Sequence, residues 1–432
     1  MVNVVVVGGG FAGMATAARL AKLRHDVTLI ESGSRLGGRL RGVEIQGRRW
    51  PLDVETVTLP GVFRDLFRKS GRPIERSVDM SLTAGRRHLF RDETVLDLPF
   101  GDRALQHDAI RAALEPELSS DPQPADEWSD WIDAWPDRWD VLRRTLLDRT
   151  PSGRRDLDRT ARRTLDVRRS IKRLAERQLE DERLVKLVLD PLRLEGQDRA
   201  TTPGYTAVRH YLDRTFGRWE FAGGFAGLAD ALETRLAERK VTIARDETAH
   251  ELTFDGIGDA RTVTSVVTDS RSLPADIVVW CASQWPAPLP RPRALPAIPA
   301  SRTFVTLGPD APTLPRDLLA HSNPPVRVAS HGDDRCTLMH LGGEDPIVSL
   351  VRAGLDLREH VVDRVTLAPP DLVRLGHWGW AWQGWTTIDD HPGIAPRHGV
   401  HFAGAHAWSG GTLEEIGMAT AAIAESIGPA PR

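Results

Sequence analysis

A run of glycines near the start of the chain has the spacing that binds a phosphate group. Gly8, Gly10 and Gly13 follow an apolar segment at residues 2–7 and open an Ala-rich segment at residues 11–23. In such a pattern the first glycine permits a tight turn, the second lets a pyrophosphate approach the backbone, and the third allows a helix to pack closely on a strand. The free N–H groups at the helix start also attract an anion. Residues 8–13 therefore predict a dinucleotide site.

An acidic residue follows at the position where a ribose is bound. Glu31 ends a second apolar segment, residues 27–31, and is followed by Ser32. A carboxylate there accepts hydrogen bonds from ribose hydroxyls, and it repels a 2′-phosphate, so we expect no NADP at this site. The alternative is a glycine turn with an unrelated surface Glu31. A strand, a helix and an acidic residue follow one another at the spacing of a dinucleotide site, which favours the ribose site.

A second glycine turn separates FAD from NAD. Arg35 is followed by Gly37, Gly38, Arg39 and Leu40. An NAD dehydrogenase does not need this turn, whereas a flavoprotein uses it to bring more backbone and an arginine to the pyrophosphate and flavin. We therefore predict FAD as the cofactor.

Four stretches of the chain resemble one family of flavoproteins. The stretches are residues 4–39, 58–67, 216–228 and 399–412, of which the last contains Gly404, Ala405, Gly411 and Thr412. They are similar to the FAD-dependent amine oxidase, protoporphyrinogen oxidase and phytoene desaturase superfamily, and most similar to the bacterial phytoene (carotenoid) desaturases. Only the first and last stretches are specific motifs.

The resemblance implies a fold and a division into domains. We expect an α/β protein with a Rossmann-like FAD-binding domain, which has a parallel sheet in a three-layer ββα arrangement, and an interleaved α+β substrate domain with a helical part. The FAD-binding domain is expected at residues 1–80, 216–285 and 396–432, and the substrate domain at residues 81–215 and 286–395. The implied FAD contacts are Gly8, Gly10, Phe11, Ala12, Gly13, Glu31, Ser32, Arg35, Gly37, Gly38, Arg39, Leu40, Ala249, Cys281, Ala282, Gly404, Ala405, Gly411, Thr412 and Leu413.

The chain departs from the desaturases at two motifs. Residues 53–56 lack the family's Gly-Pro, and Glu415 and Ile416 stand where small residues are usual. These departures argue against a long, membrane-extracted C40 substrate.

A third glycine group, Gly223-Gly224 with Gly227, lacks the G-x-G spacing, so we interpret it as helix packing. Without a second dinucleotide motif we expect oxygen or a quinone, rather than NADPH, to exchange electrons with the flavin.

Candidate catalytic residues lie near the end of the chain. Trp378, Trp380 and Trp382 alternate with other residues and would share one face of a strand. They predict either an aromatic wall for a flat substrate or ordinary core packing. Within the closing motif, His406 is a candidate to donate a proton or polarise a group, and Trp408 is a candidate to face the flavin. Each has a structural role as its alternative.

Several functions agree with these patterns. The leading prediction is a desaturase or dehydrogenase that passes hydride from a C–H bond of an apolar, conjugated small molecule to the flavin. An amine oxidase-like enzyme is the alternative, although the chain has no Lys after Lys240 and only two tyrosines, Tyr205 and Tyr211. A third possibility is a redox-neutral role, as an isomerase or a partner subunit.

Composition sets the outer limits. The chain has 432 residues, a net charge of -3 and two cysteines. We expect no nucleic-acid partner, no disulfide framework, no metal site and a cytoplasmic location with possible peripheral membrane contact.

Residues 103–200 are expected to be helical, with Pro191 ending or kinking one helix. Within them four tryptophans, Trp128, Trp131, Trp135 and Trp139, predict core packing, with a channel lining or membrane edge as the alternative. A Pro-rich link at residues 284–300 is expected to cross between domains.

Overall fold

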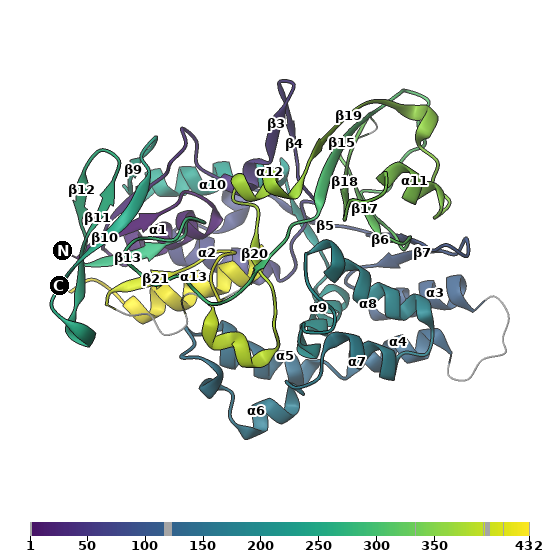
Figure 1. Cartoon of the computed structure of the whole chain (residues 1–432), viewed down its shortest axis with the longest axis horizontal. Helices are drawn as coiled ribbons and strands as arrows, with labels where there is room; N and C mark the ends of the chain where they lie inside the picture. The colour runs from purple at the N-terminus through teal and green to yellow at the C-terminus, as the bar shows by residue number, and fades with distance from the viewer. Residues whose placement is uncertain are drawn as a thin grey trace.

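Two β-sheets, each flanked by helices, form the molecule (Figure 1). The computed structural model describes residues 2–115, 123–332, 334–391, 393, 398–408 and 410–431. No helix in these ranges is long and apolar enough to cross a membrane.

The first sheet has five parallel strands in the order β21-β13-β1-β2-β9. Val4 is paired with Val27 on one side and with Ile277 on the other. Continuous runs of Val and Ile suit these strands because both faces of a parallel sheet are covered. The strands are β1 Asn3–Val7, β2 Asp26–Ile30, β9 Thr242–Ala244, β13 Ile277–Trp280 and β21 Val400–Phe402.

Helices cover one face of this sheet, and a small antiparallel sheet covers the other. Val4 and Val6 pack with the helices, while Val5 and Val7 pack with Leu252 and other residues of the small sheet. This arrangement confirms the predicted ββα three-layer fold. The helices are α1 Phe11–Lys22, α2 Pro60–Ser70, α10 Gly224–Glu238 and α13 Leu413–Ile427, and the strands are β10 Ala249–Asp255, β11 Thr262–Thr268 and β12 Ser272–Pro274.

The second sheet is mixed and has seven strands in the order β19-β15-β18-β17-β16-β6-β7. Its only parallel pair among the described strands is β16 with β6, which joins segments more than 200 residues apart. Helix α11 (Pro346–Val351) covers one face through Ile347 and Leu350. The strands are β6 Gly85–Leu89, β7 Val95–Pro99, β15 Ser301–Leu307, β16 Asp317–Ala320, β17 Val326–Ser330, β18 Arg335–His340 and β19 Val361–Leu367.

A lobe of helices lies beside this mixed sheet, at the lower right in Figure 1. Trp128, Trp131 and Trp135 are buried in its core, which confirms core packing for the first tryptophan run. The expectation that Pro191 ends or kinks its helix is corrected in one respect, because the helix continues to Leu194. The helices are α3 Arg103–Leu114, α4 Pro124–Asp133, α5 Pro136–Leu142, α6 Arg159–Thr164, α7 Ile171–Gln178, α8 Glu182–Leu194 and α9 Val208–Phe216.

The Pro-rich link runs from the end of β13 to the start of β15, and so from the first sheet to the second. Within it β14 (Pro296–Ala297) pairs with β20 (Gly379–Trp380), which follows α12 (Pro369–Arg374). Because β20 contains only Gly379 and Trp380, the prediction of three tryptophans on one strand face is wrong: Trp378 and Trp382 both lie outside the strand. Four further short strands are β3 Val43–Ile45, β4 Arg48–Trp50, β5 Met80–Leu82 and β8 Trp219–Phe221.

Candidate functional site

The two predicted glycine turns lie against each other. The Gly37 N–H donates to the Gly9 carbonyl at 2.8 Å, and Gly10 and Gly37 form an isolated β-bridge. A Cβ atom on Gly38 would lie 3.2 Å from the Gly10 Cα. The structure therefore brings residues 8–13 and 37–39 together, although 23 residues separate the two motifs.

The first turn has the shape of a phosphate cradle. A Cβ on Gly13 would lie 1.8 Å from the Gly8 carbonyl oxygen, so only glycine lets α1 start this close to β1. A Cβ on Gly10 would meet no atom within 4 Å, so the backbone at the N-terminus of α1 faces open space. This combination lets an anionic group reach the helix N–H groups.

Glu31 is held at the carboxyl end of β2. Its carboxylate accepts the Gly9 N–H at 2.7 Å and the Gly33 N–H at 2.8 Å. The Ser32 hydroxyl donates to Glu31 Oε1 at 3.3 Å. A carboxylate has about four acceptor positions, so these three hydrogen bonds leave capacity for a ribose hydroxyl.

Arg39 and Arg35 are exposed beside this cradle. Neither side chain makes a hydrogen bond or ion pair with a described residue. Arg39 is therefore available to a phosphate or flavin oxygen. Leu40, by contrast, is buried in the core of the first domain.

The closing motif reaches the same place from the other end of the chain. Strand β21 pairs with β13, and a Cβ on Gly404 would lie 3.5 Å from the Ala12 Cβ. Thr412 caps α13: its hydroxyl accepts the Glu415 N–H at 3.3 Å, and Glu415 Oε2 accepts the Thr412 N–H at 3.2 Å. Glu415 thus serves the cap, and Ile416 is buried in the core. Glu415 and Ile416, which stand where small residues are usual in the family, therefore both have structural roles here.

Of the other predicted cofactor residues, Cys281 and Ala282 lie next to the cradle. A Cβ on Gly8 would lie 3.0 Å from the Ala282 nitrogen and 3.1 Å from the Cys281 carbonyl carbon, so the end of β13 borders the cradle. Gly411 faces open space at the start of α13, and Leu413 is half-buried. The remaining ones, Phe11, Ala12, Ala249 and Ala405, are buried.

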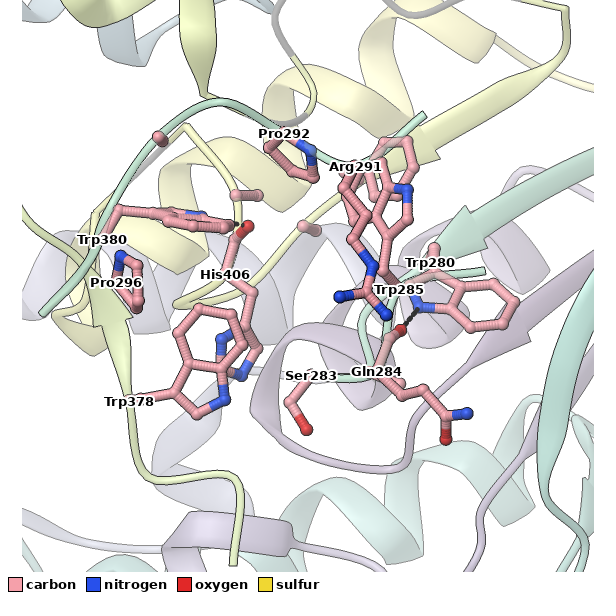
Figure 2. A pocket seen from close by; sticks show the side chains of 15 residues that line it. Trp280, Ser283, Gln284, Trp285, Arg291, Pro292, Pro296, Trp378, Trp380 and His406 are labelled. Atoms are coloured by element: carbon pink, nitrogen blue, oxygen red, sulfur yellow. Dashed lines mark hydrogen bonds between the residues drawn. The ribbon is translucent and has the colours of Figure 1, made fainter. Parts of the chain in front are cut away.

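An aromatic cavity of about 490 Å³ lies at the carboxyl ends of β13 and β21 (Figure 2). Small-molecule sites measure roughly 300–1,000 Å³. Trp378 and Trp380 form one wall, with ring centroids 5.1 Å apart and planes at 88°. Trp285 stacks on Phe402 at 4.5 Å on the other side. The lining is completed by Trp280, Ala282, Ser283, Gln284, Arg291, Pro292, Ala294, Pro296, Ala403, His406 and Ala407.

His406 lies between this cavity and the closing motif. Its ring is 4.3 Å from that of Trp378, and its carbonyl accepts the Trp380 indole N–H at 2.5 Å. Burial, with a smaller effect from Arg39, lowers the pKa of His406 to about 3. The imidazole is therefore neutral at pH 7, and its buried Nδ1 has no partner among the described residues. It suits hydrogen bonding to a ligand better than donation of a proton as an imidazolium.

The other two tryptophans of interest lie away from the cavity. Trp408 is buried in the core of the helical lobe near Ile388. The ring centroid of Trp382 lies 6.2 Å from that of Tyr205 and 5.3 Å from that of His391. These positions favour structural roles for both.

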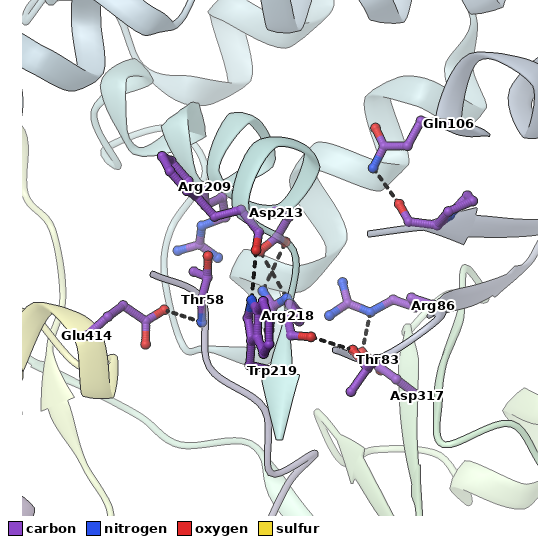
Figure 3. A network of polar contacts seen from close by, with 12 residues as sticks. Thr58, Thr83, Arg86, Gln106, Arg209, Asp213, Arg218, Trp219, Asp317 and Glu414 are labelled. Carbon is purple, nitrogen blue, oxygen red and sulfur yellow. Dashed lines mark hydrogen bonds and ion pairs between the residues drawn. The ribbon is translucent and has the colours of Figure 1, made fainter. Parts of the chain in front are cut away.

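A polar network crosses from the closing motif to the mixed sheet (Figure 3). Glu414 accepts the Thr58 N–H at 3.4 Å, and burial raises the pKa of Glu414 to about 7. Arg218 pairs with Asp213 at 3.0 Å. Further along, Arg86 on β6 pairs with Asp317 on β16 at 2.8 Å, so charged groups from both domains meet between the two sheets.

Some lining residues were missed from the sequence. Trp280 and Trp285 flank the predicted cofactor residues Cys281 and Ala282, and this proximity was the available signal. Arg291 gives no such signal because it enters the cavity through the path of the Pro-rich link. Among the described residues no group of three His, Cys, Asp or Glu side chains is placed to hold a metal ion.

These features fit FAD. The open face of Gly10, the unpaired Arg39, the residual acceptors of Glu31 and the free Nδ1 of His406 all border one edge of the parallel sheet. Dinucleotides bind in doubly wound proteins at this edge, outside the carboxyl ends of the strands.

Comparison with known proteins agrees with a dinucleotide-binding site at the start of the chain. Residues 6–69 match the model of an NAD(P)-binding Rossmann-like domain. The chain is 24% identical over 295 residues to 4,4'-diapolycopene oxygenase of Methylomonas sp, covering 64% of this chain and 55% of that protein. It is 42% identical over 73 residues to the zeta-carotene-forming phytoene desaturase of Myxococcus xanthus, covering 17% and 14%. The chain thus spans about half or less of these relatives' length.

Solved structures share the fold over nearly the whole chain. An oxidoreductase from Methanosarcina mazei has a TM-score of 0.64 at 17% identity, covering 98% of this chain and 100% of that one. Putrescine oxidase bound to putrescine has a TM-score of 0.64 at 14% identity, covering 98% of both chains. Together with the two glycine turns and the closing motif, these matches relate the chain to the superfamily of FAD-dependent amine oxidases, protoporphyrinogen oxidases and carotenoid desaturases, with distant homology to the bacterial carotenoid desaturases and oxygenases.

Proposed function

We propose that this chain binds FAD between its first forty residues and its closing motif, and that it oxidises a C–H bond of an apolar, conjugated small molecule. Bound FAD would accept the hydride, the second hydrogen would leave as a proton to solvent, and oxygen or a quinone would reoxidise the flavin. The cradle, Glu31 and Arg39 support the cofactor. The distant homology to carotenoid desaturases supports the reaction.

One observation carries the choice of substrate. The cavity at the ends of β13 and β21 has five aromatic walls, Trp280, Trp285, Trp378, Trp380 and Phe402. Flat aromatic faces pack well on a planar, apolar ligand, and each buries a large area with little loss of conformational freedom. The cavity lies next to His406 in the closing motif, where the resemblance puts the flavin.

The residues of the chain have distinct roles in this proposal. Bound FAD supplies the hydride acceptor, while the protein orients it and excludes water. Glu31 holds the ribose, and the N-terminus of α1 holds the pyrophosphate. Trp380 fixes the loop of His406 through its indole hydrogen bond, and neutral His406 offers Nδ1 to a polar group in the cavity.

Amine oxidation is the second candidate, and one feature favours it. Trp378 and Trp380 stand perpendicular at 5.1 Å, which is a shape that can hold a cationic or neutral amine against aromatic faces. The chain has no Lys after Lys240, and both tyrosines lie outside the cavity lining.

Anaerobic reduction of the FAD-loaded protein separates the candidates. We expect a conjugated polyene such as a diapocarotenoid precursor to bleach the oxidised flavin absorbance, and small primary amines to leave it unchanged. Bleaching by amines alone would replace the proposal with amine oxidation. Bleaching by neither class, with FAD bound, would favour a redox-neutral role.

Substitution of Trp380 tests the aromatic wall. We expect Trp380→Ala to lower kcat/KM by about tenfold or more, because a stacked aromatic contact contributes about 0.5–1.5 kcal/mol beyond its buried area. Trp380→Phe keeps a ring but loses the bond to the His406 carbonyl, so it separates stacking from loop position. Trp219, a half-buried tryptophan outside the cavity, provides the control as Trp219→Phe. An unchanged kcat and KM for Trp380→Ala would remove Trp380 from the substrate site.

A further inference from the structure

One charged side chain lies among the residues that line the aromatic cavity. Among the 15 described residues of this lining, Arg291 alone is charged at pH 7, because the lining contains no Asp, Glu or Lys and the low pKa of His406 keeps that imidazole neutral. Arg291 makes no hydrogen bond or ion pair with a described residue. An unpaired guanidinium contributes nothing to the binding of a wholly apolar molecule, so it indicates a polar end on the ligand.

The backbone on both sides of Arg291 is anchored to the fold. The Ala287 carbonyl accepts an N–H of β10 at 2.7 Å, and the Leu295 carbonyl accepts an N–H next to β20 at 2.8 Å. Pro290 and Pro292 flank Arg291 in the sequence. Each proline fixes its own φ angle and restricts the residue before it. The backbone of Arg291 therefore has little freedom to lose when a ligand binds.

The Pro-rich link brings Arg291 to one side of the cavity. The Trp285 indole N–H donates to the Leu289 carbonyl at 3.1 Å, which holds the link against this tryptophan. Figure 2 shows Arg291 on the same side as Trp285, across the cavity from Trp378 and Trp380. A flat ligand that packs between the two sides would therefore have one end beside the guanidinium.

Uncharged hydrogen-bonding groups add to this lining. Ser283 and Gln284 follow β13, and neither side chain has a hydrogen-bond partner among the residues that the structure describes. The serine hydroxyl and the glutamine amide can each donate a hydrogen bond. The cavity thus offers one cation and further donors to a ligand, and its described lining offers no carboxylate.

Charged groups outside the lining do not take over this role. Glu251 of β10 forms an isolated β-bridge with Ala287 of the link, but its exposed carboxylate makes no ion pair with Arg291. Arg39 is a second cation, close enough to lower the pKa of His406. In the proposed function Arg39 binds FAD, which leaves Arg291 as the cation for the substrate.

We propose that Arg291 binds a carboxylate at one end of the conjugated substrate. The planar guanidinium has paired N–H donors that match the two oxygens of a carboxylate. One carboxylate balances the single charge of Arg291, whereas a diphosphate would leave negative charge uncompensated among aromatic rings. A cationic amine would meet a like charge. That the substrate is conjugated rests on the proposed function, whereas its anionic end rests on Arg291.

Binding of a conjugated acid and of its uncharged ester tests the proposal. The FAD-loaded full chain is titrated with all-trans-retinoic acid or with its methyl ester, and quenching of tryptophan fluorescence gives each Kd. At about pH 7, where the acid is ionised, we expect it to bind about tenfold more tightly than the ester, because it adds a hydrogen bond between charged groups. This preference should shrink in about 0.5 M NaCl, which screens exposed charges. Equal affinity for the two probes, or binding of neither, overturns the proposal.

Substitutions assign the preference to one side chain. Arg291→Gln should bring the affinity for the acid to that for the ester, whereas Arg291→Lys keeps the charge and should keep part of the preference. Arg293→Gln is the matched control, because Arg293 is exposed, follows a proline of the same link and does not line the cavity. The control should keep the tenfold preference of the wild type. Flavin absorbance and thermal melting of each variant verify that it is folded.

Two results with the variants would contradict the assignment. One is an equal loss of preference in Arg293→Gln, which would indicate the overall charge of the link. The other is weaker FAD binding by Arg291→Gln with an unchanged preference for the acid, which would assign Arg291 to the cofactor.

Flavin reduction separates this inference from the proposed function. Bleaching of the flavin by neutral polyenes, together with equal binding of acid and ester, would overturn the carboxylate site and leave the proposed reaction in place. A preference for the acid that depends on Arg291, without bleaching by any polyene, would support the carboxylate site and overturn the proposed reaction.

Discussion

At the scale of the residue, Glu31 has its carboxylate fixed by the protein itself. Two backbone N–H groups, from Gly9 and Gly33, hold both oxygens at the end of β2. A ribose would therefore meet an oriented acceptor, and little side-chain freedom would be lost on binding.

Exchange of this carboxylate tests its role. We expect Glu31→Gln to weaken FAD binding by about 10- to 100-fold, because hydrogen bonds to a charged group contribute about 1.5–3 kcal/mol. Fluorescence quenching of FAD during titration of the apoprotein gives the Kd. Glu44→Gln, at an exposed residue of β3, serves as the control. Equal affinity in Glu31→Gln and the wild type would place the ribose elsewhere.

Glu414 predicts a dependence of stability on pH. Its pKa is raised by burial to about 7, from 4.5, so the protein must bury a charge once the pH exceeds 7. The stability associated with the protonated form is complete below pH 4.5 and is lost as the pH rises through 7. Gln cannot ionise, and its carbonyl can still accept the Thr58 N–H.

Urea denaturation of Glu414→Gln measures this effect. Relative to the wild type, the free energy of unfolding of the variant should be about 2–3 kcal/mol higher at pH 8 than at pH 5. A difference between variant and wild type that is the same at both pH values would show that Glu414 is ionised throughout.

Single residues were predictable where the chemistry lies in a short motif. Gly8, Gly13 and Glu31 act within one β-α-β unit, and their spacing alone identifies them. Trp285 reaches the cavity only because the Pro-rich link turns it onto Phe402 of β21, more than 100 residues away. No local pattern contains that contact.

At the scale of the element, the β1–α1 junction depends on one close approach. A Cβ on Gly13 would overlap the Gly8 carbonyl oxygen at 1.8 Å, both atoms being fixed by the strand and the helix. Gly61, in the first turn of α2, has open space instead. Gly13 and Gly61 both lie in the first turn of a helix and differ in the space around them, so alanine can be compared at the two positions.

Alanine at these positions should have opposite effects. Gly13→Ala is expected to lower the free energy of unfolding by more than about 3 kcal/mol and to abolish FAD binding, because α1 must move away from β1. Gly61→Ala should raise the free energy of unfolding by about 0.5–1 kcal/mol, since alanine loses less backbone entropy in a helix. Thermal or chemical denaturation, followed by circular dichroism, measures the free energy of unfolding of both variants and the wild type. Similar stability of Gly13→Ala and the wild type would contradict the close packing of this junction.

Two elements show why local rules gave incomplete predictions. Pro191 lies one turn before the end of α8, where the lost N–H costs one bond and the surrounding core of Leu187, Leu192 and Leu194 still holds the helix. Trp382 leaves the face of Trp380 because its N–H donates to Gln197 Oε1 instead of continuing β20. In both cases tertiary contacts outweigh the sequence pattern.

At the scale of the whole molecule, the fold class followed from the sequence, but the second sheet did not. The parallel unit β1-α1-β2 is contained within thirty residues, whereas β6 pairs with β16 more than 200 residues later. Such pairings follow from loop paths and burial across the whole chain, which a periodicity in one segment does not encode. The exact domain boundaries remain a prediction.

Several buried or half-buried histidines predict acid sensitivity of the whole structure. Burial is the main cause that lowers the pKa of His377 and His406 to about 3, and that of His331, His340 and His401 to about 4. Neutral histidine is thus favoured in the folded state. The associated stability is complete above the unfolded pKa of about 6.5 and is lost as the pH falls toward 4, at up to about 1.4 kcal/mol per pH unit for each histidine.

Chemical denaturation between pH 7 and pH 5 tests this prediction. We expect the free energy of unfolding to fall steadily over this range, in the direction opposite to the effect of Glu414. Constant stability from pH 7 to pH 5 would mean that these histidines have ordinary pKa values.

The order of strands in the first sheet also governs how the protein is made. Strand β1 leaves the ribosome before its neighbour β13, which follows some 270 residues later, and β21 and α13 follow β13. At roughly 5–20 residues per second, the nucleotide cradle waits on the order of tens of seconds for the partners that cover it. During that interval the apolar strand β1 lacks its neighbour β13, and the Ala-rich α1 lacks α10 and α13, which pack against it. Nascent chains arrested before β21 should therefore retain no FAD and should depend on chaperones.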